Sequence, residues 1–213
     1  MNVFNFRLIK RTAFFAFTLS FMLLGFQNLQ AQDFAYSKKR KMERQHLRYG
    51  IEGQAAPELS KEIEWINGNG EEISPIQLAD NKGKFTVIYG FQSWCPGCHS
   101  RGLPALKKMS EALKGNDNVQ FMAIQTVFEG GHINTKEKIV ETQEQYDLDI
   151  PFGHDPGNNS SGNRSFTMTD YRTGGTPWFI FIDQNGKVMF NDYHINVDAA
   201  ITYLKDIKAQ TTP

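Results

Sequence analysis

The pattern of apolar and polar positions predicts strands that alternate with helices along most of the chain. Residues 85–91, 119–127 and 178–182 are mostly apolar and rich in β-branched and aromatic side chains, which is typical of strands buried on both faces of a sheet. Residues 95–113 and 135–146 carry apolar side chains every three or four positions, as helices with one buried face do. Such an alternation favours parallel strands joined by helices that cross over the sheet.

Two hairpins add antiparallel strands to this sheet. Near its start, residues 62–66 and 71–73 flank an Asn-Gly-Asn-Gly turn. Near its end, an Asn-Gly turn precedes residues 188–190, and residues 198–207 form a closing amphipathic helix. The sequence therefore predicts an α/β fold: a three-layer sandwich with a central mixed sheet, helices on both faces and an N-terminal hairpin.

Three stretches have a weaker pattern. Residues 150–152 predict a short strand, and the Gly-, Asn- and Ser-rich residues 155–168 predict a surface loop. Residues 33–49 carry six basic and two acidic side chains, with the basic ones between residues 38 and 48. We expect them to form a solvated end of the chain, the alternative being a basic arm that contacts an anionic membrane or a partner.

The first 31 residues predict a signal peptide. Arg7, Lys10 and Arg11 precede an uncharged stretch at 12–26, and Ala31 is a small residue at the expected cleavage site. The stretch is shorter than the roughly 20 residues of a membrane span, although Leu29 leaves an uncleaved anchor as the alternative. We expect an exported protein of the periplasm or cell envelope, with a signal peptide (1–31), a basic extension (32–53) and one domain (54–213).

Charge argues against nucleic acid as a partner. The 213 residues have a formal net charge of zero. Because residues 1–31 hold three basic and no acidic side chains, the remainder holds 20 basic and 23 acidic ones. A chain of this charge has no strong field to attract nucleic acid.

The chain has two cysteines, Cys95 and Cys98. A bridge between residues so close in sequence closes almost no loop, so it would contribute little chain entropy to stability. A redox role or a metal site remains. A Cys-x-x-Cys pair is half of a zinc site, but the chain has no second pair and its histidines form no local ligand pair, so we expect no metal.

Placement favours the redox role. Cys95 follows a predicted strand and opens a predicted helix, whose unpaired N–H groups and partial positive charge favour a thiolate. Cys98 lies on the same helical face and can attack a mixed disulfide formed at Cys95. Pro96 fits the first helical turn, where its missing N–H costs nothing.

Three segments resemble the thioredoxin superfamily, and most closely its exported TlpA/ResA-like thiol–disulfide oxidoreductases. Residues 54–57, with 76–78 and 83–84, resemble the N-terminal hairpin of that family. Residues 93–98 (Ser-Trp-Cys-Pro-Gly-Cys) resemble its active site, and residues 174–177 (Gly-Gly-Thr-Pro) its cis-proline loop. The resemblance covers residues 54–208.

This resemblance implies a mechanism and partners. Pro177 would be cis and would face Cys95, exposing the backbone of Thr176 to an extended substrate segment. Trp94, Pro96 and Gly97 would complete the substrate-binding surface. The expected substrates are protein thiols and disulfides, exchanged in the reducing direction. The chain has no nucleotide-binding motif and no expected cofactor, so electrons would come from or go to a separate partner, such as a membrane thiol carrier.

Three positions depart from the family. Tyr89 stands where thioredoxins have a buried Asp, and Arg101 stands where TlpA/ResA-like proteins often have Glu. The proton acceptor for Cys98 is therefore open, with Glu129 and His99 as candidates. The helix proline, Pro104, lies one residue later than usual, which suggests a different start of the helix.

Two other functions on the same fold remain as alternatives. A peroxiredoxin-like peroxidase has the pattern Pro-x-x-x-Thr-x-x-Cys, but counting back from Cys98 gives Cys95 and Phe91 in place of Thr and Pro. A Sco-like copper-binding chaperone spaces its cysteines by three residues and has a His in the loop where this chain has residues 175–177.

Overall fold

The computed structural model describes residues 49–157 and 164–208. The predicted signal peptide, most of the basic extension and the middle of the predicted loop at 155–168 lie outside the described residues. None of the helices in these two ranges has the length and apolar character that crossing a membrane requires.

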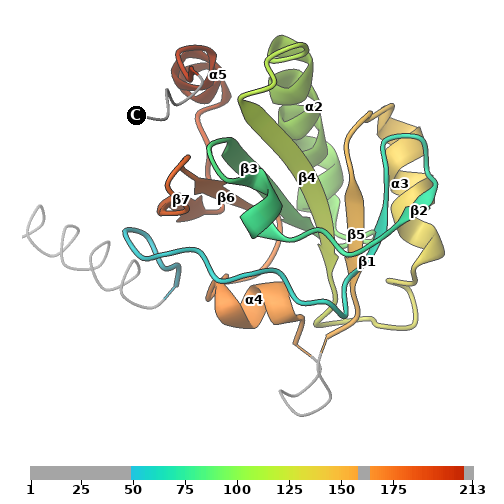
Figure 1. Cartoon of the computed structure of the whole chain (residues 1–213). Helices are drawn as coiled ribbons and strands as arrows, with labels where there is room; N and C mark the ends of the chain where they lie inside the picture. Colours follow the sequence, from blue (N-terminus) through green and yellow to red (C-terminus); the bar gives the residue numbers. More distant parts are fainter. Residues whose placement is uncertain (1–48, 158–163, 209–213) are drawn as a thin grey trace, which may run out of the picture. The chain divides into compact units, whose positions relative to one another are not determined.

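Within the described residues, seven strands form one mixed sheet in the order β2-β1-β5-β4-β3-β6-β7 (Figure 1). The central strands run parallel; they are β3 (Phe85–Phe91), β4 (Val119–Thr126) and β5 (Phe152–Asp155). The others pair antiparallel; they are β1 (Glu64–Ile66), β2 (Glu72–Ile73), β6 (Trp178–Ile182) and β7 (Val188–Asp192). Both predicted hairpins are confirmed.

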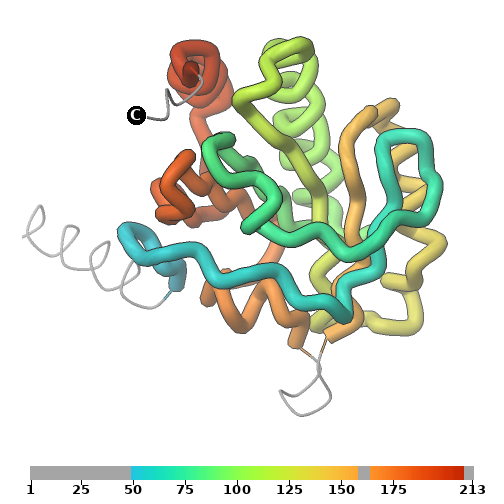
Figure 2. Tube along the Cα trace, viewed as in Figure 1, coloured from blue at the N-terminus to red at the C-terminus, as the bar shows by residue number. Residues whose placement is uncertain are grey.

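In the part of the chain that the structure describes, three helices cover one face of this sheet. One short helix and the segment that follows residue 49 cover the other face. On the first face lie α2 (Leu103–Ala112), α3 (Glu137–Tyr146) and α5 (Val197–Lys205), packed against alternate side chains of β3. On the second face, α4 (Phe166–Asp170) ends near Tyr171, which packs with Ile88 and Trp178. Figure 2 shows the segment that follows residue 49 crossing the sheet on the side of α4. The expected three-layer fold is confirmed.

The helix predicted at 95–113 is present but irregular. Helical backbone begins at Pro96, so Cys95 stands at its N-terminus. A π-helical turn, η2 (Cys98–Gly102), then precedes α2, with Leu103 N–H donating to Cys98 O five residues earlier. The prediction of one regular helix is therefore wrong at this turn.

The prediction of a surface loop at residues 155–168 is wrong at both ends of this range. Asp155 is fully buried at the end of β5, and its carboxylate accepts the N–H groups of Phe166 at 3.0 Å and Thr167 at 2.8 Å. These bonds satisfy donors at the start of α4. The short strand expected at 150–152 lies about two residues further on, as β5.

Candidate active site

Cys95 lies at the junction of β3 and the active-site helix. Its backbone N–H donates to Gln92 O at 3.1 Å, and its carbonyl oxygen accepts the N–H groups of Cys98 and His99 at 3.0 and 3.2 Å. Cys95 Sγ in turn accepts the N–H of Cys98 at 3.3 Å. The sulfur of Cys95 therefore lies at the helix N-terminus, among backbone N–H groups that have no partner within the helix.

Cys98 differs from Cys95 in its surroundings. Both are free thiols, but Cys95 retains 8% exposure and Cys98 has none. Burial raises the pKa of Cys98 to about 12, and its hydrogen bond with Cys95 acts in the same direction. The backbone of Gln92 and the side chain of Thr176 lower this pKa, but burial dominates.

The loop before β6 faces Cys95. The Thr176–Pro177 peptide bond is cis, as the resemblance implied. Cys95 Sγ donates to Thr176 O at 3.7 Å, and a Cβ atom placed on Gly97 would lie 3.3 Å from Pro177 Cδ. Glycine at residue 97 therefore lets this loop approach without the tight contact that a Cβ atom would make.

The five residues expected to bind substrate surround Cys95. Trp94 is 41% exposed and Pro96 is exposed, while Gly97, Thr176 and Pro177 are half-buried. Ile133, which the sequence did not single out, is 43% exposed. The hydroxyl of Ser93 lies 3.5 Å from Ile133 O, so the loop that carries Ile133 lies next to the turn that carries Trp94.

Neither candidate proton acceptor is hydrogen-bonded to Cys98. His99 Nε2 donates to Ser93 O at 2.6 Å and Nδ1 lies 2.9 Å from Tyr146 Oη, so both ring nitrogens are engaged elsewhere. The Glu129 side chain is exposed, and only its backbone carbonyl is tied to the site, by Gln92 and Asn134. In the described part, no carboxylate is hydrogen-bonded to either cysteine.

Sequence similarity places this site in a family. The redoxin profile matches residues 51–206, which span both cysteines and the cis-proline loop. The chain belongs to the redoxin family. No curated protein matches the sequence.

Solved structures agree with this redoxin assignment. A protein of the thioredoxin-like superfamily is 31% identical over 73% of this chain and 98% of its own, with a TM-score of 0.62. A thiol-disulfide isomerase from Corynebacterium glutamicum is 25% identical over 74% of this chain and 98% of its own, with a TM-score of 0.61. The thioredoxin domain of a thiol-disulfide oxidoreductase from Bacteroides vulgatus shares the fold, with a TM-score of 0.53. It is 19% identical over 74% of this chain and 99% of its own. The redoxin is therefore a thiol–disulfide oxidoreductase of the thioredoxin superfamily.

Two residues of the redoxin site gave no signal in the sequence. Asn134, 1% exposed, accepts hydrogen bonds from Ser93 and so joins the loop after β4 to the active-site turn. Tyr146, at the end of α3, binds His99 across 47 positions of sequence. A single polar residue in a loop or on a helix carries no pattern that predicts such a partner.

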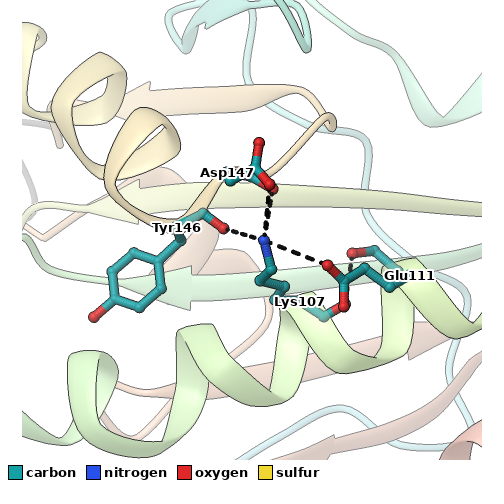
Figure 3. A network of polar contacts seen from close by, with 5 residues as sticks. Lys107, Glu111, Tyr146 and Asp147 are labelled. Carbon is teal, nitrogen blue, oxygen red and sulfur yellow. Dashed lines mark hydrogen bonds and ion pairs between the residues drawn. The ribbon is translucent and has the colours of Figure 1, made fainter.

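A charged network fixes the end of α3 that carries Tyr146. Lys107 Nζ donates to Tyr146 O at 2.9 Å and pairs with Asp147 at 3.1 Å and Glu111 at 3.3 Å. Figure 3 shows the carbonyl of Tyr146 turned toward Lys107 and its ring turned away. The network thus ties α2 to α3 and helps to place the Tyr146 hydroxyl near His99.

A groove of about 290 Å³ lies beside Pro177. Phe179, Ile195 and Val197 contribute apolar side chains to it, and the exposed Arg101 contributes a positive one. Among the described residues, no three His, Cys, Asp or Glu side chains gather as a metal site would require.

Proposed function

We propose that this redoxin is an exported thiol–disulfide reductase that reduces disulfides of protein substrates. The observation that carries the proposal is the arrangement of two sulfurs of unequal access. Cys95 reaches the surface beneath the Thr176 carbonyl, while Cys98 is fully buried behind it. This geometry suits attack by Cys95 and resolution by Cys98.

The reaction has two exchange steps. The Cys95 thiolate attacks one substrate sulfur, a Cys95–substrate bond forms, and the substrate disulfide breaks with its electron pair on the departing thiolate. Cys98 then attacks Cys95 Sγ, forms the Cys95–Cys98 disulfide and releases the second substrate thiolate, which takes the proton of Cys98. The substrate gains two electrons, and a separate dithiol protein must reduce the pair again.

The environment of Cys98 supports the reducing direction. A dithiol protein is a strong disulfide oxidant when its reduced form is stabilised. A stabilised thiolate in the reduced form provides such stabilisation. Here burial opposes a thiolate at Cys98 and raises its pKa to about 12. Cys98 therefore keeps its proton in the resting dithiol, so no thiolate at Cys98 adds stability to the reduced form, which favours giving up electrons.

A protein substrate fits the surface around Cys95. The exposed side chains of Trp94 and Ile133 present apolar surface on one side, and the groove beside Pro177 lies on another. Extended peptide segments bind by backbone pairing with side chains in such pockets. Export rests on the signal-peptide pattern of residues 1–31, and N-terminal sequencing of the protein from a cell-envelope fraction would test it.

The first test of this function is the reduction potential of the Cys95–Cys98 pair, measured by equilibration in dithiol/disulfide buffers. We expect a value near or below about −250 mV, whereas a value near about −120 mV would make the protein an oxidant. A pair without reversible titration would contradict the redox function itself.

A second test identifies the order of attack and the substrates. The Cys98→Ser variant should accumulate mixed disulfides with its substrates through Cys95, and the matched Cys95→Ser variant should not. Trapping through Cys98 in the Cys95→Ser variant would reverse the assigned roles.

A further inference from the structure

Tyr89 lies at the centre of β3, directly beneath Cys98. Its side chain is fully buried, with its ring 4.8 Å from that of Phe179 and parallel to that of Phe91 at 6.0 Å. Its hydroxyl donates to Cys98 O at 3.3 Å. The ring is held by its aromatic neighbours, so the position of the hydroxyl is fixed except for rotation of its proton.

The helix above Tyr89 is shaped to receive this hydroxyl. A Cβ atom on Gly102 would overlap with Tyr89 Oη, so only glycine leaves room for it. Gly102 ends the π-helical turn that begins at Cys98, and such a turn holds one residue more than an α-helical one. The extra residue accounts for the late position of Pro104. Tyr89, Gly102 and Pro104 thus belong to one local arrangement.

We propose that Tyr89 is a catalytic residue: its hydroxyl donates a hydrogen bond to the Cys98 thiolate as Cys98 attacks the mixed disulfide. This inference rests on the proposed function. For this the hydroxyl proton must rotate from Cys98 O, its acceptor in the structure, toward the Cys98 side chain, which already interacts with the Tyr89 hydroxyl. The proton that Cys98 loses ends on the departing substrate thiolate. Tyr89 itself keeps its proton throughout.

The chemistry of Tyr89 excludes the role of a base. Burial raises the pKa of Tyr89 well above its usual range, and the charge of Cys98 and a hydrogen bond with it raise this pKa further. Tyr89 therefore stays protonated and acts as a donor. A carboxylate at this position would accept a proton, so this site replaces proton acceptance by thiolate stabilisation.

The test uses the two thiol steps of the purified, reduced protein with dithiobis(nitrobenzoate), a disulfide whose released thiolate is coloured. At substoichiometric reagent, Cys95 releases the first thiolate and Cys98 the second as it closes the Cys95–Cys98 disulfide. Loss of a hydrogen bond to the Cys98 thiolate should raise the pKa of Cys98 by about one to two units, which lowers the fraction of Cys98 present as thiolate. A thiolate of higher pKa is also a stronger nucleophile, and this offsets about half of the loss in rate. Tyr89→Phe should therefore slow the second phase about three- to tenfold and leave the first unchanged.

Tyr171→Phe is the matched control, because Tyr171 is also buried and its hydroxyl donates to a backbone carbonyl, that of Pro57, at 2.6 Å. It should lose stability but keep both phases at the wild-type rate. The inference would be overturned if the second phase had the same rate in Tyr89→Phe and in the wild type. It would also be overturned if Tyr89→Phe slowed the first and second phases by the same factor. A wild-type protein that releases no second thiolate would contradict the proposed function instead.

Discussion

Asn134 Oδ1 lies 2.9 Å from both the backbone nitrogen and the hydroxyl of Ser93 and accepts a hydrogen bond from each. The amide nitrogen of Asn134 donates to Glu129 O at 3.0 Å and to Gly130 O at 3.3 Å. One buried side chain thus shapes its own loop and attaches it to the turn that precedes Cys95. The exposed Trp94 follows Ser93 directly, so Asn134 also holds the backbone from which that ring extends.

Replacing Asn134 should loosen this connection. Asn134→Ala leaves the N–H of Ser93 without its acceptor and removes one donor each from Glu129 O and Gly130 O, which keep Gln92 Nε2 and backbone N–H groups as partners. We expect the free energy of unfolding to fall by about 1–3 kcal/mol. Urea denaturation followed by tryptophan fluorescence measures the loss. The control is Asn69→Ala in the β1–β2 turn, where the asparagine is exposed. Equal stability of the two variants would contradict the role of Asn134.

Alkylation of the folded, reduced protein should distinguish the two cysteines. At about pH 8, iodoacetamide should modify Cys95 and leave Cys98 unmodified, because Cys98 has no exposed surface and burial raises its pKa to about 12. Peptide mapping by mass spectrometry locates the label. Urea should make both cysteines reactive, which serves as the control. Modification of Cys98 before Cys95 would refute the assigned order.

The raised pKa of Cys98 also predicts how stability depends on pH. An unfolded thiol titrates near about 8.5, whereas the folded one titrates near 12. Below the unfolded pKa both states hold the proton and the contribution of Cys98 is fully present. Above it the unfolded state loses the proton first, so this contribution is lost as pH rises toward the folded pKa.

The measurement compares the reduced wild type with Cys98→Ala by urea denaturation at several pH values. From about pH 9 upward, the difference in unfolding free energy should shift against the wild type by up to about 1.4 kcal/mol per pH unit. Tyrosines that titrate in both proteins cancel in this difference. The difference should be constant between pH 6 and 8, and a constant difference up to pH 10.5 would disprove the shift.

Sequence patterns predicted the elements that depend on local composition. Strands β3 and β6 begin and end where expected, because both are short apolar runs bounded by turn residues or proline. The approach of Pro177 to Cys95 is not visible in any local pattern. It was expected only from the resemblance to a family, since 82 positions separate the two residues.

The contacts that support the site could not be predicted in this way. Ser93 meets Asn134 across 41 positions, and His99 meets Tyr146 across 47. Each contact requires the sheet and helices to be assembled first, and each uses a single ordinary polar side chain. The late Pro104 did indicate an altered helix start, but the cause, a π-helical turn above Tyr89, depends on packing between the helix and β3.

The contact between His99 and Tyr146 leads to a last prediction. Tyr146→Phe removes one hydroxyl, which lies 2.9 Å from His99 Nδ1 and 3.1 Å from His99 O, and keeps the ring. We expect the free energy of unfolding to fall by about 1 kcal/mol, because Nδ1 and the carbonyl lose a partner in a half-buried position. Urea denaturation again provides the measurement.

Tyr203→Phe provides the control for this change. Tyr203 is 49% exposed on α5, its ring packs edge-on against Phe85, and its hydroxyl makes no hydrogen bond within the described residues. Loss of the Tyr203 hydroxyl should leave the free energy of unfolding unchanged within a few tenths of a kcal/mol. In Tyr146→Phe, nuclear magnetic resonance of the His99 ring should still find the proton on Nε2, because Ser93 O continues to accept it. Equal stability of the two variants would mean that Tyr146 does not hold His99 in solution.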